Sequence, residues 1–179
     1  MDNSLVVNKS TSVLERYGLI SKEYLHLGSY GPSKGQKVAL KYLKHLGLPM
    51  IATSSSERVL IDGIKDINLI KANFDEYNIL LKNAKATICM SEFKEGWCRV
   101  LHEAAIHGTP IIGSGLGGMS ELLEIGGFTS STTDNLSDDL NTRTKEISLS
   151  KDIINLYRAF TLQKFCEAWR LCVLELLDE

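Results

Sequence analysis

Two glutamates, Glu95 and Glu103, are the residues whose type and spacing point most directly to chemistry. Glu95 lies in a predicted loop before Gly96, and Glu103 lies in the predicted helix that follows. Eight residue steps at helical rise separate their Cα atoms by roughly 12 Å. The start of that helix, around 97–100, offers unpaired backbone N–H groups and the positive end of a helix dipole. An anion bound there would lie between two carboxylates, which suits a nucleotide sugar with its central diphosphate and its hydroxyls at both ends.

The residues around the two glutamates form a wider pattern. Glu95-Gly96-Trp97 is followed by Glu103-Ala104-Ala105, then by Gly108-x-Pro110 and Gly117-Gly118-x-x-Glu121. This pattern resembles the donor-site signature of the family-four retaining glycosyltransferases, GT-B enzymes whose C-terminal domain carries a Glu-x7-Glu motif. The similarity is densest over 91–121 and extends more weakly from about residue 28 to the end of the chain.

The resemblance implies a role for each matched residue. Glu103 would accept hydrogen bonds from the ribose hydroxyls, and Lys34 would contact the donor diphosphate. Glu95, the expected catalytic residue, would contact the donor sugar and stabilise positive charge as the glycosidic bond breaks. Gly117 and Gly118 would present backbone amides to phosphate or sugar. The remaining matched positions expected to bind the donor are Gly96, Trp97, Cys98, Arg99 and Glu121.

Some positions depart from the family pattern. Cys98 stands in place of the usual glycine, which puts a side chain close to the diphosphate position, and Arg99 replaces an apolar residue. Ser29 and Tyr30 stand where relatives have an arginine. The sequence leaves open whether Arg99 reaches a phosphate or is solvated, and whether Trp97 flanks the sugar or packs. His102 and His107 have no paired nucleophile, so they are expected to serve packing and the helix C-terminus.

Length and composition bound the class of protein. A chain of 179 residues holds one domain with a sizeable core, whereas a complete GT-B enzyme has two Rossmann-like domains. We therefore expect a single donor-binding domain over 1–179. A net charge of −2 argues against nucleic-acid binding, and no apolar run is long enough to span a bilayer. The four cysteines match neither a zinc site nor a disulfide framework, so reduced thiols in a cytoplasmic protein are expected.

Short apolar strands alternate with helices along the chain. Strands are expected at 4–7, 23–28, 49–53, 66–71 and 86–90, with one more after the central helix. Helices are expected at 34–46, 75–81, 151–160 and 162–177, with a short helix or turn at 11–17 and at most a short helix at 136–140. Asn73 is expected to cap the helix at 75–81, and Ser56 a short helix to Ile61. This alternation predicts an α/β fold with a parallel sheet and helices on both faces.

The predicted sheet should bring three loops together. Ligands of parallel sheets bind beyond the carboxyl ends of the strands, and the loops at 28–35, 91–97 and 114–121 all follow strands. We therefore expect these loops to face one crevice.

Residues 151–179 are expected to form the C-terminal helices. The last of them carries an apolar stripe made of Phe165, Trp169, Cys172 and Leu176, widened by Leu162, Cys166 and Val173. The favoured interpretation is core packing. The other is docking on a partner domain, because family members return their final helix across the cleft.

These inferences favour the donor-binding half of a retaining glycosyltransferase of the hexosyltransferase type. It would use a nucleotide-diphosphate sugar as substrate, without a cofactor or a metal, and would need an acceptor domain, from a separate chain or a homo-oligomer, for full activity. One alternative is a non-catalytic nucleotide-sugar-binding protein or partner subunit, favoured by Cys98 and the missing arginine. A second is a nicotinamide-dependent Rossmann oxidoreductase, but the glycines at 115–118 come late rather than after the first strand.

Overall fold

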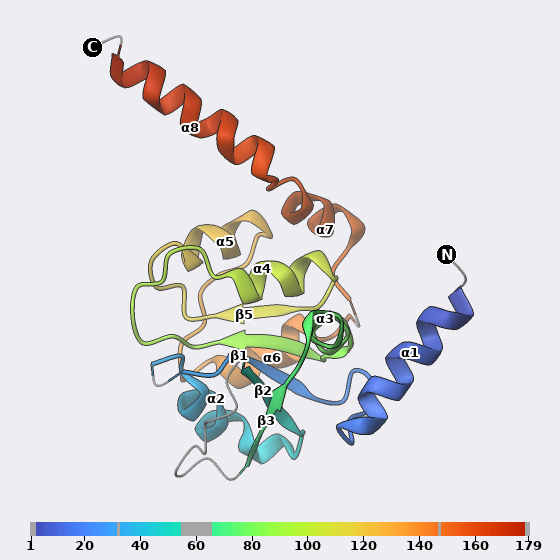
Figure 1. The fold of residues 1–179 in the computed structure, drawn as a ribbon. Helices are drawn as coiled ribbons and strands as arrows, with labels where there is room; N and C mark the ends of the chain where they lie inside the picture. The colour runs from blue at the N-terminus through green and yellow to red at the C-terminus, as the bar shows by residue number, and fades with distance from the viewer. Residues whose placement is uncertain (1–2, 32, 55–65, 147, 178–179) are drawn as a thin grey trace.

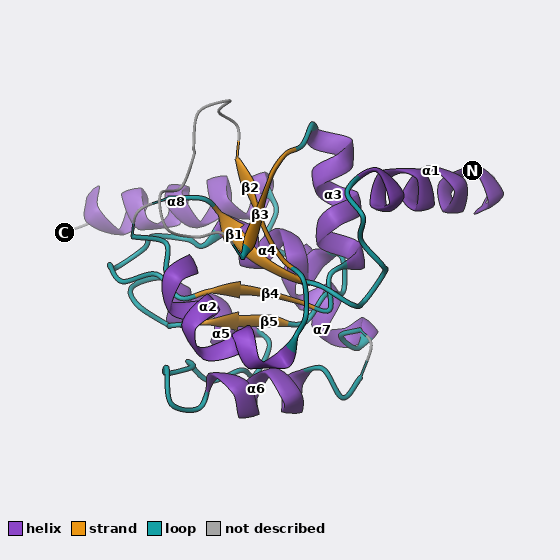
Figure 2. Ribbon diagram, turned by 90° about the horizontal axis from the view of Figure 1, so that it is seen from below, coloured by secondary structure: helices purple, strands orange, loops and turns teal. Residues whose placement is uncertain are grey.

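The computed structural model describes residues 3–31, 33–54, 66–146 and 148–177. Their strands are Leu25–Ser29 (β1), Met50–Ser54 (β2), Ile67–Lys71 (β3), Ala86–Cys89 (β4) and Ile111–Gly113 (β5). These strands form one parallel sheet in the order β3-β2-β1-β4-β5, with helices on both faces (Figures 1 and 2). The predicted single α/β domain with a parallel sheet is confirmed.

The helices occupy most of the predicted positions. They are Asn3–Arg16 (α1), Gln36–Leu43 (α2), Phe74–Asn83 (α3), Arg99–Ile106 (α4), Met119–Ile125 (α5), Leu136–Arg143 (α6), Lys151–Arg158 (α7) and Leu162–Leu177 (α8). A short 3-10 turn, Lys44–Leu46, continues α2, and α6 is longer than expected. The predicted cap at Ser56 and its helix lie outside the described residues.

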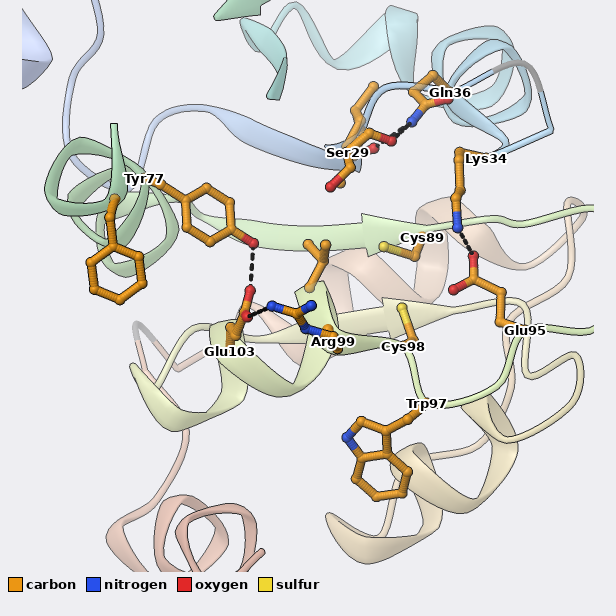
Figure 3. Close-up of a pocket in the computed structure, with 14 residues that line it drawn as sticks. Ser29, Lys34, Gln36, Tyr77, Cys89, Glu95, Trp97, Cys98, Arg99 and Glu103 are labelled. Atoms are coloured by element: carbon orange, nitrogen blue, oxygen red, sulfur yellow. Dashed lines mark hydrogen bonds and ion pairs between the residues drawn. The ribbon is translucent and has the colours of Figure 1, made fainter. Parts of the chain in front are cut away.

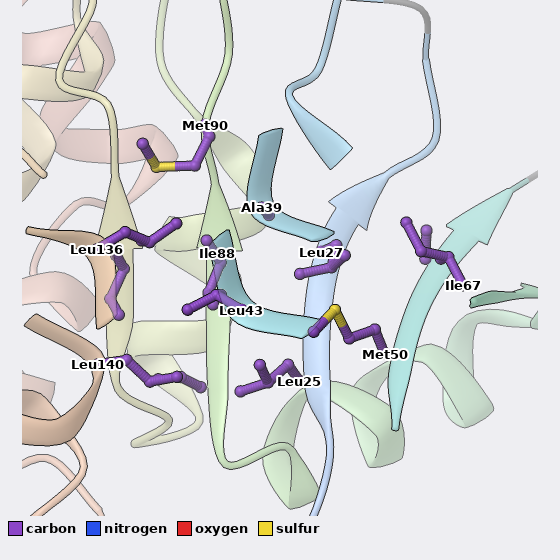
Figure 4. Close-up of a cluster of buried hydrophobic side chains, with 13 residues drawn as sticks. Leu25, Leu27, Ala39, Leu43, Met50, Ile67, Ile88, Met90, Leu136 and Leu140 are labelled. Carbon is purple, nitrogen blue, oxygen red and sulfur yellow. The ribbon is translucent and has the colours of Figure 1, made fainter. Parts of the chain in front are cut away.

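Alternation along the strands divides the core between the two faces of the sheet. On β1, Leu25 and Leu27 belong to the cluster covered by α2 and α6, which Figure 4 shows. The residue between them, His26, lies on the other face and meets Thr53 Oγ1 at 3.3 Å. This is the period-two pattern of a strand buried on both sides.

The second face is covered by α3, α4 and α5, with α7 packed behind α4. Leu101 and Met119 are fully buried there, as is Tyr157 of α7. The Tyr157 hydroxyl donates to the Leu122 carbonyl at 3.0 Å, which satisfies its polar end inside the core. Helix α4, which carries Glu103, is therefore held between the sheet and α7.

The N-terminal segment is a correction to the sequence interpretation. The strand expected at 4–7 and the short helix or turn at 11–17 are one continuous helix, α1. A short apolar run does not by itself distinguish a strand from a helix, and here the contacts with α3 decide. Val13 and Leu14 are buried, and Lys9 pairs with Asp75 at 2.7 Å.

The final helix also differs from expectation. Helix α8 extends away from the sheet domain in Figure 1, and of its predicted stripe the described side chains, Cys166, Trp169 and Val173, are exposed. For these three side chains the preferred interpretation, core packing, is therefore wrong. Docking on a partner domain stays a prediction. Within the described residues, no helix is both long and apolar enough to cross a membrane.

The predicted cap of α3 is confirmed, and its contribution can be measured. The Asn73 side chain accepts from the Glu76 N–H at 3.0 Å, and the Glu76 carboxylate accepts from the Asn73 N–H at 3.1 Å. We expect Asn73→Ala to lower the free energy of unfolding by about 1 kcal/mol, because this capping box loses its first bond. Chemical denaturation measures the loss. Asn73→Asp keeps an acceptor, so a variant no more stable than Asn73→Ala would contradict the capping role.

Candidate functional site

A cavity of about 580 Å³ opens at the carboxyl ends of β1 and β4. Strand order reverses between these two strands, since β2 and β3 lie to one side of β1 and β5 lies beyond β4. Such a switch point is where open α/β sheets bind their ligands. The lining residues, shown in Figure 3, are Leu27, Gly28, Ser29, Lys34, Gln36, Phe74, Tyr77, Cys89, Glu95, Trp97, Cys98, Arg99, Val100 and Glu103.

Six of the predicted site residues meet in this cavity. Lys34, Glu95, Trp97, Cys98, Arg99 and Glu103 all line it. Lys34 and Glu95 lie at one end of Figure 3, and Glu103 lies at the other. Gly96, Gly117, Gly118 and Glu121 are not among its lining residues. Of the three loops expected to face one crevice, those after β1 and β4 contribute side chains to the cavity. The loop at 114–121 contributes none, so for this loop the expectation is wrong.

Lys34 and Glu95 form an ion pair at one end of the cavity. Lys34 Nζ lies 2.9 Å from Glu95 Oε1 and 4.7 Å from the centre of the Phe93 ring. The Ser91 hydroxyl donates to the same carboxylate oxygen. Burial alone would raise the pKa of Glu95, but the hydrogen bonds from Ser91 and Lys34 and the lysine charge outweigh it and lower the pKa. Glu95 is therefore held as a carboxylate beside Lys34. A bound anion could pair with this lysine in place of Glu95.

The ion pair predicts a pH-dependent contribution to stability. Because folding lowers the pKa of Glu95, the contribution is complete above the unfolded value, about 4.3, and is lost as the pH falls through the folded pKa. We expect Lys34→Met to reduce the free energy of unfolding by less than about 1 kcal/mol near neutral pH, since the lysine side chain is 38% exposed. At an acid pH below the folded pKa, by the same linkage, the reduction should vanish.

Urea denaturation at the two pH values measures this difference. Lys37→Met changes an exposed lysine on α2, three residues after Lys34, and serves as the matched control; its effect on stability should be small and the same at both pH values. Equal losses for Lys34→Met at neutral and acid pH would contradict the ion pair.

The glycine loop after β5 supports Glu95 from behind. Glu95 N–H donates to the Leu116 carbonyl at 3.2 Å, and Gly118 N–H donates to the Glu95 carbonyl at 2.9 Å. A Cβ atom on Gly117, whose φ is 71°, would lie 2.2 Å from the Glu95 carbonyl oxygen. The glycines therefore allow two loops to meet backbone to backbone, and the Gly118 amide is already bonded to protein.

Glu103 is fixed at the opposite end of the cavity. The Tyr77 hydroxyl donates to Glu103 Oε2 at 2.7 Å, and Arg99 Nη2 lies 3.5 Å from Glu103 Oε1, one helical turn away. Burial raises the pKa of Tyr77, and the bond to the carboxylate raises it further, so the phenol stays a donor. The Arg99 side chain is 83% exposed, so it remains free to turn toward solvent or a ligand. Glu103 is thus an oriented acceptor rather than a loose surface carboxylate.

Trp97 packs on one side against His102 and against Phe160, which follows α7. Its indole N–H donates to His102 Nδ1 at 3.1 Å, and its ring lies 5.3 Å from that of Phe160. Because Nδ1 accepts, the proton of the neutral His102 is on Nε2, which donates to the Tyr157 carbonyl at 2.9 Å. His102 therefore has the packing role expected of it. Trp97 combines packing on this side with a place in the cavity wall.

Cys98 precedes α4, where the family pattern has a glycine. It is 3% exposed and interacts with Cys89, at the end of β4. The hydrogen bond from the Cys89 thiol lowers the pKa of Cys98, and a bond from the Leu101 N–H lowers it further, against the effect of burial. The Cys98 sulfur therefore shares the positive end of α4 with any anion that binds there.

Sequence reasoning missed the residues that orient the glutamates. Tyr77 and Ser91 hold Glu103 and Glu95 respectively. Gln36, which is buried, donates to the Leu27 and Ser29 carbonyls at 3.1 and 2.7 Å and so fixes the cavity end of β1. Phe74, which is 78% exposed, lines the cavity beside Tyr77. Its sequence signal was an apolar residue directly after the cap of α3.

Comparisons with known proteins agree with this architecture. No protein-family model matches the sequence, and a search of curated proteins gives no significant match. Among solved structures, sucrose-phosphate synthase from Thermosynechococcus elongatus is 16% identical, with a TM-score of 0.71 over 94% of this chain and 49% of its own. HepE from Anabaena, solved in complex with UDP-glucose, is 20% identical, with a TM-score of 0.65 over 88% of this chain and 49% of its own.

A third match is a glycosyltransferase involved in avilamycin A biosynthesis. It is 20% identical, with a TM-score of 0.66 over 83% of this chain and 51% of its own. The chain thus spans about half the length of the structures it matches. At this level of identity the likeness establishes the fold alone. The five-stranded domain corresponds to one half of the GT-B fold of these glycosyltransferase neighbours.

Proposed function

We propose that this chain is the donor-binding, C-terminal-type half of a family-four retaining glycosyltransferase. The observation that carries the proposal is the cavity in which an oriented carboxylate, Glu103, and the Lys34–Glu95 ion pair lie on either side of the α4 amino end. This arrangement offers an acceptor for hydroxyls, a cation and helix dipole for a diphosphate, and a second carboxylate beyond it.

The nucleotide would bind with its ribose at Glu103. A carboxylate held by Tyr77 has its second oxygen available once Arg99 turns aside, and a vicinal diol can donate to both oxygens. The diphosphate would then lie at the amino end of α4, within the positive field of the helix. Phe74, exposed at the cavity edge beside Tyr77, is placed to contact the base.

Lys34 would exchange partners when the donor binds. In the free protein it neutralises Glu95 at 2.9 Å, and the diphosphate would attract it away through stronger charge-assisted bonds. Glu95 would then face the sugar with Ser91 still bonded to it, where its charge stabilises the oxocarbenium-like transition state. Glu95 and Glu103, which would otherwise repel an anion, are thus paired with Lys34 and Arg99 before the donor binds.

The acceptor would be bound outside this domain. The chain aligns with only about half of each glycosyltransferase neighbour. We therefore propose that a separate domain, another chain or a second copy supplies acceptor contacts, and that the protein acts in the cytoplasm. Retention at the anomeric carbon, hexosyl transfer and the absence of a metal requirement belong to the same proposal.

Calorimetric titration with a panel of uridine-, guanosine- and adenosine-diphosphate sugars tests donor binding. We expect saturable 1:1 binding of at least one of them, and little or no transfer or hydrolysis by the purified chain. UDP-glucose is the first choice, because HepE was solved with it. Absence of binding across the panel would overturn the proposal, and rapid turnover by the isolated chain would overturn the need for a partner.

A non-catalytic nucleotide-sugar-binding protein is the second candidate. It is favoured by the Cys98 sulfur beside the diphosphate position and by Ser29 in the cavity wall where the family pattern has an arginine. Both changes weaken the stabilisation of the negative charge on the nucleotide diphosphate as it leaves. Donor binding without transfer or hydrolysis, even after addition of candidate acceptor-domain chains, would select this function.

A further inference from the structure

We propose that Cys89 and Cys98 form a reversible dithiol–disulfide site in the wall of the cavity. The two residues come from different elements, the end of β4 and the residue preceding α4, and both line the cavity. Figure 3 shows their sulfur atoms directed toward one another, with the Lys34–Glu95 pair nearby. The inference concerns a modification of the protein itself and stands apart from donor chemistry.

The two thiols have the asymmetry that such a pair requires. The Cys89 thiol donates a hydrogen bond to the Cys98 sulfur, which lowers the pKa of Cys98 and raises that of Cys89. The Leu101 N–H adds a second bond to Cys98, at the positive end of α4. The charged groups that face the pair are Glu95, which opposes the thiolate, and Lys34, which favours it. Because Cys98 stands at the N-terminus of α4, where the helix dipole favours a thiolate, Cys98 is the nucleophile in this proposal and Cys89 the resolving thiol.

The surroundings allow a small oxidant and exclude a large one. Cys89 and Cys98 are 6% and 3% exposed and pack in an apolar cluster with Leu101 and Met119. Their accessible side faces the cavity, which has room for many water-sized molecules. A hydroperoxide can therefore approach from the cavity, whereas the backs of both side chains are closed by protein.

The oxidant is proposed to be a hydroperoxide, and the reaction proceeds in two balanced steps. The Cys98 thiolate attacks the terminal peroxide oxygen and breaks the O–O bond, so that with one proton an alcohol or water leaves and a sulfenic acid forms. The Cys89 thiol then attacks the Cys98 sulfur, releases water and forms the S–S bond. Two thiols lose two electrons, and the peroxide gains them. A dithiol reductant reverses the process by exchange.

The disulfide would close the loop that carries Glu95. Glu95 lies between the two cysteines in sequence, and its backbone is bonded to Leu116 and Gly118. Oxidation would therefore fix this loop at a second point and draw the start of α4 toward β4, since bonded sulfurs lie about 2.05 Å apart. Both changes act on the amino end of α4, where the proposed function places the diphosphate.

Tryptic mapping after treatment with hydrogen peroxide tests the site. Cleavage after Lys85, Lys94 and Arg99 places the two cysteines on separate peptides, 86–94 and 95–99. We expect a linked pair of these peptides in the folded wild-type protein, and its loss after dithiothreitol. Urea-unfolded protein should form the pair several-fold more slowly. Peptides 86–94 and 95–99 that both stay free, or that link mainly to the exposed Cys166, would overturn the proposal.

Two variants and a ligand sharpen the test. Cys166→Ser should leave the linked pair unchanged, and Cys98→Ser should abolish it. Saturating UDP-glucose should slow its formation at least several-fold, because a diphosphate covers the sulfurs and opposes the thiolate; this arm alone rests on the proposed function. UDP-glucose that binds without slowing oxidation would overturn access through the cavity. A disulfide that forms in a protein without donor binding would refute the proposed function and leave this site intact.

Discussion

Calorimetry of the Glu103→Ala variant is expected to show UDP-glucose bound about 10–150-fold more weakly than by the wild-type protein. Removing an acceptor that bonds through its charge costs about 1.5–3 kcal/mol, which corresponds to that range of dissociation constants. The carboxylate is already oriented by Tyr77 at 2.7 Å, so the wild-type protein loses little side-chain entropy on binding. The variant loses both the acceptor and this preorganisation.

Three further variants separate the causes. Glu103→Gln keeps a neutral acceptor of the same shape, so its loss should lie near the lower end of the range. Tyr77→Phe keeps the carboxylate but frees it, which should give a smaller loss. Glu124→Ala changes an exposed glutamate on α5, outside the cavity, and should bind as the wild type does. An unchanged affinity of Glu103→Ala, with an unchanged melting temperature, would remove the ribose role.

The largest expected loss of stability follows replacement of Gly35 by alanine. Gly35 precedes α2 with φ of 76°, and a Cβ atom there would lie 1.8 Å from the Met90 carbonyl oxygen. The left-handed backbone costs about 1–2 kcal/mol, and displacing β4 from α2 adds a packing cost of similar size. We expect the free energy of unfolding to fall by about 3 kcal/mol, or the melting temperature by roughly 6–12 °C.

Gly47→Ala provides the matched control for this prediction. Gly47 has nearly the same backbone angle, with φ of 65°, but an added Cβ would meet nothing within 4 Å. It should lose only the conformational part, about 1–2 kcal/mol. Denaturant titration of both variants measures the difference. Equal losses at the two positions would show that α2 and β4 tolerate separation, contrary to the close approach described here.

Local patterns explain what the sequence predicted well. The cap at Asn73 and the strands 49–53 and 86–90 depend on residues next to them in the chain, so their signals are complete within a short window. The convergence of Lys34, Glu95 and Glu103 also followed, because parallel strands direct their following loops to one edge. Two of the three loops expected to face one crevice therefore line the cavity, and the binding roles of these residues remain predictions.

Long-range contacts explain what the sequence could not predict. The donor that orients Glu103, Tyr77, lies 26 residues away, and a half-buried tyrosine in a helix carries no mark of such a bond. The N-terminal run at 4–7 became helix because α1 packs against α3, which its own residues do not specify. For α8, the apolar stripe was read correctly as an amphipathic pattern, but a pattern does not state what covers it.

The backbone pairing of Glu95 with Gly117 makes two distant segments one mechanical unit. A shift of the segment after β5 must move Glu95 with it, because the two backbones are in direct contact and no side chain between them could absorb the movement. Insertions or deletions in either segment would therefore require a compensating change in the other. Homologous chains are expected to vary in these two lengths together, or in neither.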